Sequence, residues 1–210
     1  MFATTTLRGI AFRPARFCAP LAGFTHSAFR RVVSSLGGCG AFWTEMLSAR
    51  HLLGEDLRRS PYLRRSPQEP RLIYQLMVRD GDPLERVVER LATLQPDGLD
   101  LNLACHAPSI RHLDAGSRLF QDPIALARAV GVLRACWPGL LLVKIRLGRE
   151  HAAWRESLRQ RLRIFEDAGV DAITLHPRFF EDKFKRRTRH EEVAVADLRE
   201  PLALHGDAVG

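Results

Sequence analysis

Short apolar segments alternate along this chain with longer segments whose apolar residues recur at the helical period. Near-continuous apolar character in a short segment predicts a strand that is covered on both faces. Seven such strands are expected, over Phe17–Pro20, Ala41–Thr44, Leu72–Met77, Gly98–Leu101, Leu140–Ile145, Asp171–Leu175 and Leu202–Leu204.

Amphipathic helices are expected between these strands. Leu84, Val87, Val88 and Leu91 lie at i, i+3, i+4 and i+7, which is typical of a helix with one apolar face. Two of the segments open with an acidic N-cap residue followed by proline, a favourable helix start. The helices are expected over Thr25–Leu36, after Asp82-Pro83, after Asp122-Pro123, over Trp154–Ala168 and over Glu191–Arg199.

Repeated βα units predict a parallel sheet with helices on its outer face and right-handed crossovers. Seven strands of this kind fit an incomplete TIM-type (β/α)₈ barrel better than an open sheet. Such barrels typically need about 250 residues, so a chain of 210 residues is expected to lack about one βα unit. Residues 1–210 are therefore expected to form a single partial domain.

Composition narrows the class of protein. No run of 18 apolar residues predicts a membrane span, and Met1–Arg16 lacks the pattern of a signal peptide. The four cysteines are scattered without a CxxC pair, which suits free thiols in a reducing cytoplasm. The eight histidines show no metal-ligand spacing, so no metal is expected.

The chain is strongly basic, with a formal net charge of +8 and an isoelectric point near 10.1. This favours a polyanionic partner such as RNA, although an arginine-biased proteome gives the same charge. Arginine outnumbers lysine 29 to 3. Four arginines in the proline-broken segment 57–67 could contact phosphates, but a solvated loop is the favoured interpretation.

Six of the seven expected strands end in candidate site residues, and five of these ends carry polar side chains. Because the carboxyl ends of parallel strands meet at one face of a barrel, these residues are expected to converge on a common site. The strand ends are Ala19-Pro20-Leu21-Ala22-Gly23, Gln75, Asn102-Leu103-Ala104-Cys105, Lys144-Ile145-Arg146, His176-Pro177-Arg178 and His205-Gly206-Asp207.

Lys144 and Cys105 carry the most specific chemistry. Lys144 interrupts an apolar strand, and a buried cation needs an anionic partner. A structural ion pair is one reading, but an electron-rich ligand is favoured because adjacent strand ends offer few carboxylates. A lysine beside a flavin would stabilise the charge of the reduced ring. Cys105 is expected at the mouth of the site, where a thiol that keeps its proton can act as a general acid.

His176, at the end of its strand and followed by Arg178, is interpreted as a ligand contact in preference to a core histidine. The chain has neither GxGxxG nor a Walker motif. Gly37-Gly38 is better explained as the end of a helix, so phosphate capture by a glycine-rich first turn is not expected.

Several motifs, in order from about residue 17 to 208, resemble those of the tRNA-dihydrouridine synthases. The opening APMAGVT motif is similar to residues 19–25, the TEM signature to residues 44–46 and DLNxGC to residues 100–105. VKIRxG matches residues 143–148, the HGR…YKG segment resembles 176–178 with 184–185, and the strand ending in NGD resembles 201–207.

This resemblance implies an FMN-dependent enzyme that uses NADPH to reduce the C5=C6 bond of a uridine flipped out of tRNA. Cys105 would give the proton to C5, while Asn102 and Arg178 would contact the substrate. The implied flavin contacts are Pro20, Leu21, Ala22, Gln75, Lys144, His176, His205, Gly206 and Asp207.

The chain also departs from the family pattern. Ala104 and His106 replace a glycine and a proline beside the cysteine, Pro177 replaces the glycine of HGR, and His205 replaces the asparagine of NGD. By the family pattern, the last βα unit, with its flavin-phosphate contacts, and the C-terminal helical domain are expected to be missing. Two alternatives stay open: another FMN-dependent barrel oxidoreductase, such as a dihydroorotate dehydrogenase or an ene-reductase, and a catalytically silent RNA-binding remnant.

Overall fold

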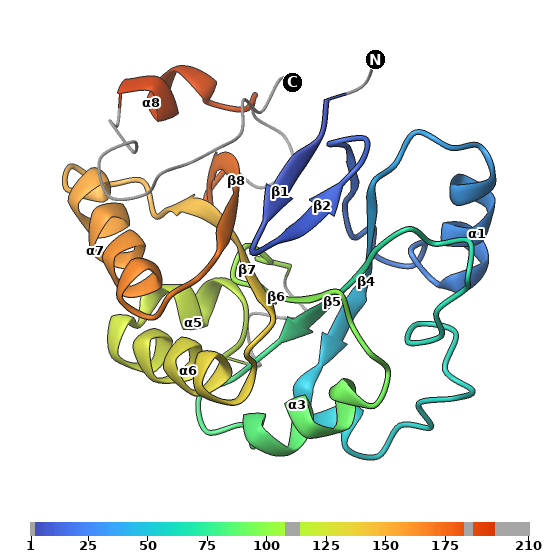
Figure 1. Cartoon of the computed structure of the whole chain (residues 1–210). Helices are drawn as coiled ribbons and strands as arrows, with labels where there is room; N and C mark the ends of the chain where they lie inside the picture. The colour runs from blue at the N-terminus through green and yellow to red at the C-terminus, as the bar shows by residue number, and fades with distance from the viewer. Residues whose placement is uncertain (1–2, 108–113, 183–186, 196–210) are drawn as a thin grey trace.

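The structure is a computed structural model that describes residues 3–107, 114–182 and 187–195. Six parallel strands form one curled sheet in the order β3-β4-β5-β6-β7-β8 (Figure 1). The strands are β3 (Phe17–Cys18), β4 (Ala41–Ser48), β5 (Leu72–Met77), β6 (Gly98–Asn102), β7 (Leu140–Gly148) and β8 (Ala172–Phe179). This is the architecture of an incomplete TIM-type barrel, as the alternating pattern predicts.

The helices follow the strands and cover the outer face of the sheet. The longer ones are α1 (Ser27–Ser35), α3 (Leu84–Ala92), α6 (Pro123–Cys136) and α7 (Trp154–Asp167). The shorter ones are α2 (Ala49–Leu52), α5 (Ser117–Gln121) and α8 (His190–Val195). The expected helix start at Asp122-Pro123 is confirmed, because the Asp122 carboxylate accepts hydrogen bonds from the N–H groups of Ile124 and Ala125.

An N-terminal hairpin closes the amino end of the sheet. Strands β1 (Thr5–Leu7) and β2 (Ile10–Phe12) pair antiparallel across Arg8-Gly9, both at positive φ. Phe12 is fully buried against Ala41, Trp43, Ile73, Leu140 and Leu142, which form an inner apolar cluster separate from the core beneath the helices. The hairpin was not expected from the sequence, since strands of three residues carry too little pattern to be recognised.

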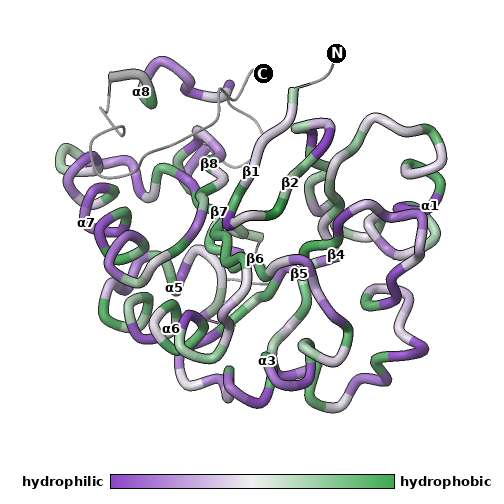
Figure 2. The backbone as a smooth tube through the Cα atoms, viewed as in Figure 1, coloured by the Kyte–Doolittle hydropathy of each residue, from purple (hydrophilic) through white to green (hydrophobic). Residues whose placement is uncertain are grey.

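The apolar residues therefore lie in two layers. The larger layer fills the space between the outer face of the sheet and α3, α6 and α7. Figure 2 shows that the central strands consist largely of hydrophobic residues. The smaller layer plugs the inside of the barrel near the amino ends of the strands. The inward positions nearer the carboxyl ends are left for polar side chains.

Some expected boundaries differ from the structure. Strand β3 ends at Cys18 and not at Pro20, because its pairing with β4 stops at Cys18–Phe42 and proline has no N–H to extend it. Strand β4 continues to Ser48 through a β-bulge between Trp43 and Met46. The expected strand Leu202–Leu204 and the end of the expected helix Glu191–Arg199 lie outside the described residues. In the described part of the chain, no helix combines the length and apolar character that crossing a membrane requires.

Candidate active site

Polar side chains occupy the inward positions of neighbouring strands in the carboxyl half of the barrel. Strand register places Gln75 beside Asp100, Asn102 beside Lys144 and Arg146 beside His176. Paired residues of parallel strands point to the same face of the sheet. The structure thus brings Gln75, Asn102, Lys144 and His176 to one end of the barrel interior.

A buried hydrogen-bonded group joins β4, β5 and β6. The carboxylate of Asp100 accepts from Trp43 Nε1 at 2.8 Å and from Gln75 Nε2 at 2.6 Å, both at its Oδ2. Gln75 Oε1 in turn accepts from Asn102 Nδ2 at 2.8 Å. Gln75 is fully buried, Asp100 is 2% exposed and Asn102 is 5% exposed. These amides are already engaged within the protein before any ligand is considered.

The turn that carries Cys105 is fixed from both sides. The Asn102 side-chain oxygen accepts from the N–H groups of Ala104 at 3.1 Å and Cys105 at 2.9 Å. The Cys105 carbonyl accepts from Ser117 N at 3.0 Å, at the start of α5. Gly116 has φ +59°, and a Cβ there would lie 2.9 Å from the Cys105 carbonyl oxygen, so only glycine fits. Cys105 itself is a half-buried free thiol.

Lys144 lies half-buried between these groups. Among the described residues, its ammonium has no hydrogen bond or ion pair. Burial lowers the pKa of Lys144. The negative charge of Asp100 on the neighbouring strand opposes this shift, and the positive charge of Arg146 adds to it. The expectation that adjacent strands offer few carboxylates is wrong in this respect, because the Asp100 carboxylate lies within electrostatic reach of Lys144. The two do not form a hydrogen-bonded pair, so the ammonium is still available to a ligand.

Burial dominates the ionisation of Asp100 and raises its pKa, while the hydrogen bonds from Gln75 and Trp43 and the charge of Lys144 act in the opposite direction. Within the described structure, its other oxygen, Oδ1, is buried without a hydrogen-bond partner. An unpartnered oxygen in a protein interior is costly and rare, and a role at a functional site is one of its explanations.

Three cationic or titratable groups meet at the ends of β7 and β8. Arg146 is buried and donates to the Phe179 carbonyl oxygen, and Arg178 Nη1 lies 3.2 Å from His176 Nε2. Burial first, and then the charges of Arg146, Arg178 and Lys144, lower the pKa of His176 to about 4. His176 is therefore neutral at physiological pH. The Cys105 thiol lies close enough to Arg146 to act on its pKa, which places Cys105 at the same end as Lys144.

His106, which stands where the family pattern has proline, is anchored at this rim. Its ring stacks on Phe180 with centroids 5.1 Å apart, and its Nδ1 lies 2.8 Å from Ser117 Oγ. The stacking and the hydrogen bond hold the His106 side chain against Phe180 and Ser117. The replacement therefore keeps the residue after Cys105 in place.

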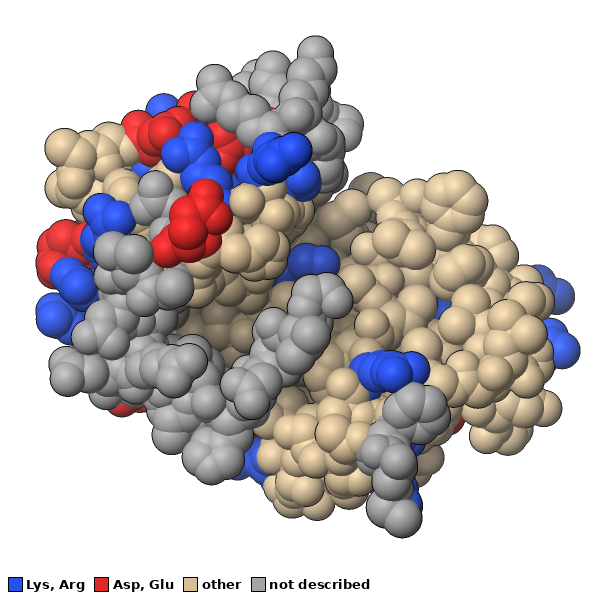
Figure 3. Space-filling view, turned by 90° about the horizontal axis from the view of Figure 1, so that it is seen from above, with Lys and Arg blue, Asp and Glu red and all other residues tan. Residues whose placement is uncertain are grey.

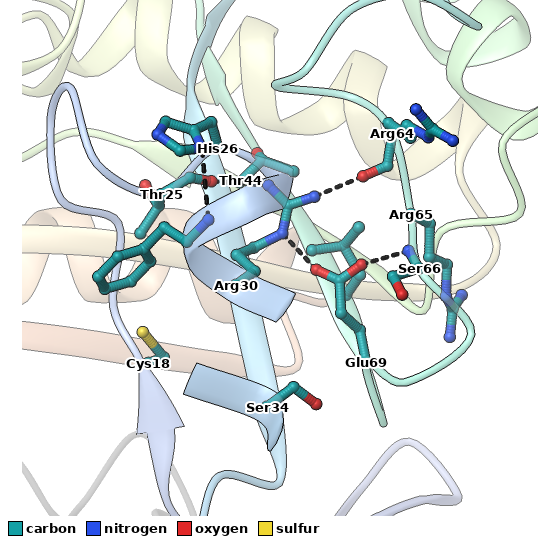
Figure 4. A network of polar contacts seen from close by, with 12 residues as sticks. Cys18, Thr25, His26, Arg30, Ser34, Thr44, Arg64, Arg65, Ser66 and Glu69 are labelled. Carbon is teal, nitrogen blue, oxygen red and sulfur yellow. Dashed lines mark hydrogen bonds and ion pairs between the residues drawn. The ribbon is translucent and has the colours of Figure 1, made fainter. Parts of the chain in front are cut away.

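Pro20, Leu21 and Ala22 form the turn after β3. Leu21 is 48% exposed and its N–H donates to Thr25 Oγ1 at 3.1 Å, which fixes the turn against the start of α1. Behind this turn, the fully buried Arg30 pairs with Glu69 and donates to the carbonyl oxygens of Thr25 and Arg64, each at 2.6 Å (Figure 4). This network ties the first helix to the arginine-containing loop, a role that the sequence does not reveal.

Other expected residues fall outside this group. His205, Gly206 and Asp207 lie outside the described residues. In the 57–67 loop, Arg58, Arg59 and Arg64 are exposed, while Arg65 pairs with Asp97 at 2.8 Å. Among the described residues, no three His, Cys, Asp or Glu side chains are grouped so that they could hold a metal ion.

The curled parallel α/β sheet is of the TIM-barrel type, and it places a thiol, a lysine and a neutral histidine at its carboxyl end, where barrels of this type carry their active sites. Residues 17–204 match the family described as "Dihydrouridine synthase (Dus)", and the chain belongs to that family. This agrees with the resemblance of its motifs.

Curated relatives extend the match. A "Probable tRNA-dihydrouridine synthase" of Helicobacter pylori is 29% identical over 196 residues, covering 91% of this chain and 58% of the relative. One of Treponema pallidum is 31% identical, covering 77% of this chain and 48% of the relative. A "tRNA-dihydrouridine(16) synthase" of Ralstonia nicotianae is 26% identical, covering 90% and 60%. The chain thus spans about half to three-fifths of the length of these relatives.

Proposed function

We propose that this chain is the catalytic part of an FMN-dependent tRNA-dihydrouridine synthase that reduces the C5=C6 bond of a uridine in tRNA with electrons from NADPH. The observation that carries the proposal is the position of Cys105. Its turn is fixed beside Asn102 and opens toward the end of the barrel that also holds Lys144 and Arg146.

The residues at this end suit a flavin. The Lys144 ammonium, half-buried and without a described hydrogen-bond partner, offers a positive charge to an electron-rich ring. Gln75 and the neutral His176 are the other described groups that would contact it, together with the exposed turn of Pro20, Leu21 and Ala22. When bound there, FMN would supply hydride-transfer chemistry, with NADPH as the source of the hydride and C6 of the uracil ring as its acceptor.

The protein's own contribution is to hold the base and to deliver a proton. Cys105 gives the proton of its thiol to C5, so that one hydride and one proton complete the reduction, and solvent returns the proton to sulfur. Asn102 and Arg178 are proposed to contact the base. Because His176 is held neutral, it can contact ligands without adding a further positive charge beside Lys144, Arg146 and Arg178.

The tRNA is proposed to approach the carboxyl end of the barrel. In the face seen from above the view of Figure 1, most of the described surface is uncharged, and charges of both signs gather on the side of α7 and α8 (Figure 3). A mixed surface of this kind is a poor phosphate-binding face. The net charge of +8 suits an RNA partner, and the exposed arginines of the 57–67 loop are candidates for phosphate contacts.

The test combines a visible spectrum with a tRNA assay. We expect the purified protein to show the absorption of bound flavin and to form dihydrouridine in an unmodified tRNA transcript supplied with NADPH, as measured by mass spectrometry of the nucleosides. Cys105→Ala should keep the flavin and lose the product. A colourless protein that binds tRNA would contradict the proposal and favour a silent RNA-binding protein. Flavin without tRNA reduction would favour another FMN-dependent oxidoreductase.

A further inference from the structure

The side-chain amides of Gln75 and Asn102 have only one orientation that satisfies their surroundings. The indole N–H of Trp43 can only donate a hydrogen bond, so Asp100 Oδ2 must be the acceptor in the bond between these two side chains. The same oxygen contacts the Gln75 side chain, which must therefore present its NH₂ group to Asp100. That choice directs the Gln75 oxygen toward Asn102 and forces Asn102 to present its own NH₂ group.

The chain of donors continues to the backbone beside the thiol. With its nitrogen turned to Gln75, Asn102 directs its oxygen to the N–H groups of Ala104 and Cys105. Those two bonds use both lone pairs of the amide oxygen. Every donor from Cys105 N–H to Gln75 thus points toward Asp100, an arrangement in which each bond strengthens the next.

We propose that Asp100 is a positioning residue: its acceptor oxygen sets the amide orientations of Gln75 and Asn102 and so holds the turn that carries Cys105. Asp100 is 2% exposed and acts through other residues. The role deepens the proposed function and rests on it for its catalytic consequence, but the positioning of the turn can be measured without flavin or tRNA.

Without this acceptor, both amides could rotate. A rotated Asn102 would present its NH₂ group to the N–H groups of Ala104 and Cys105, donor against donor, and the turn would lose both of its bonds to this side chain. It would also show an acceptor to the site in place of its remaining N–H. The position of the thiol and the polarity of the site therefore depend on one buried oxygen.

Two substitutions separate the acceptor from the charge. Asp100→Asn keeps an oxygen that can accept from both Trp43 and Gln75 but removes the negative charge near Lys144. Asp100→Leu removes both the acceptor and the charge at similar volume. Asp97→Leu is the matched control. Asp97 precedes the same strand at its amino end, and its largely buried carboxylate accepts a hydrogen bond from Leu72 N at 2.9 Å and pairs with Arg71 and Arg65.

The measurement is the rate at which iodoacetamide alkylates Cys105 in the folded full chain, followed by peptide mass spectrometry, with Cys136 as the internal reference thiol. For Asp100→Leu we expect the Cys105 rate, relative to Cys136, to change about threefold to tenfold, the equivalent of one lost hydrogen bond. Asp100→Asn and Asp97→Leu should stay close to the wild type.

Turnover gives the second readout. For Asp100→Leu we expect kcat for tRNA reduction to fall about tenfold or more with little change in KM, flavin reduction by NADPH to be unchanged, and Asp100→Asn to restore the rate.

Equal alkylation rates in all variants, or an Asn variant as impaired as the Leu variant, would overturn the proposal. If Asp100→Leu does not fold, Gln75→Met breaks the same series of hydrogen bonds one bond nearer to Cys105. It should give the same change in Cys105 alkylation. An altered alkylation rate in a protein that never reduces tRNA would uphold the positioning role and refute the proposed function.

Discussion

The two ends of this barrel are built from the same strands but have opposite character. At the amino end, the inward residues Ala41, Ile73 and Leu140 pack against Phe12 of the hairpin. Two residues further along β5 and four residues further along β7, the inward positions hold Gln75 and Lys144, and Asp100 lies beside Gln75 on β6. One end excludes water with apolar contacts, and the other concentrates groups that need a partner.

The hydrogen bonds at the two ends differ in the same way. At the amino end, Asp171 accepts a hydrogen bond from Leu141 N at 2.8 Å and pairs with Arg8 and Arg134. Both of its carboxylate oxygens therefore have partners. At the carboxyl end, Asp100 Oδ1 has no described partner, and the ammonium of Lys144 makes no described hydrogen bond. The amino end therefore contributes stability, while the carboxyl end retains unsatisfied groups that a ligand can engage.

The largest expected effect concerns Cys105, at the carboxyl end. Cys105→Ala should lower dihydrouridine formation by roughly 10²- to 10⁴-fold, the usual contribution of a positioned general acid. The midpoint of thermal unfolding should change little, because the thiol is only half-buried. Nucleoside mass spectrometry and a thermal melt check both statements. A large loss of stability with activity retained would reverse the comparison between the ends.

Phe12→Ala tests the amino end. Removing a fully buried aromatic ring should lower the free energy of unfolding by about 3–5 kcal/mol, measured by urea denaturation. The rate of tRNA reduction per folded molecule should not change, since Phe12 lies in the inner apolar cluster at the amino end, away from the proposed site. Phe24→Ala serves as the control, because Phe24 is 61% exposed and its loss should alter stability by less than about 0.5 kcal/mol.

Lys144 and Arg146 sharpen the comparison within the carboxyl end. Both face the interior of the barrel, but Lys144 lies beside Asn102, two residues nearer the amino end of β7, and Arg146 lies beside His176 nearer the rim. Lys144→Ala should weaken flavin retention by about 10- to 100-fold, as expected for a lost charge-assisted contact. Arg146→Ala should weaken it less. Equilibrium dialysis of FMN gives both constants, and equal losses would count against the flavin role of Lys144.

The smallest expected effect is a pH dependence of stability due to His176. Its pKa is about 4 in the folded protein against an ordinary value of 6.5, chiefly because of burial. Between these values the unfolded chain binds more protons than the folded one, so stability falls as the pH drops from 6.5 toward 4. His176→Gln should flatten this part of the profile of urea midpoint against pH. An unchanged slope would show that other groups cause it.

The sequence predicts the parallel sheet well because each strand is an apolar segment between helices of clear period. It also identifies Lys144 by the interruption of such a segment. Asp100 interrupts the apolar strand Gly98–Asn102 in the same way, and this interruption is the signal by which the sequence could have identified it. The pairing of Trp43 with Asp100 joins residues 57 positions apart, which no local pattern reveals.

Arg30 shows a second kind of limit. In the sequence it is one arginine among 29, and nothing distinguishes it from the exposed Arg31 beside it. Its burial depends on Glu69 and on backbone carbonyl oxygens of a loop that has no periodic pattern. The boundaries of β3 and the N-terminal hairpin were missed for the related reason that very short strands are defined by their partners.

The hairpin has a practical consequence for work with this protein. Arg8 holds it to the Pro138 carbonyl and to Asp171, and Ala15 N donates to the Ala3 carbonyl, so the first described residues lie at the amino end of the barrel. An affinity tag, fluorophore or surface tether joined ahead of β1 would emerge on the side away from Cys105. Immobilisation through the N-terminus would thus leave unobstructed the carboxyl end of the barrel, where the proposed RNA substrate would approach.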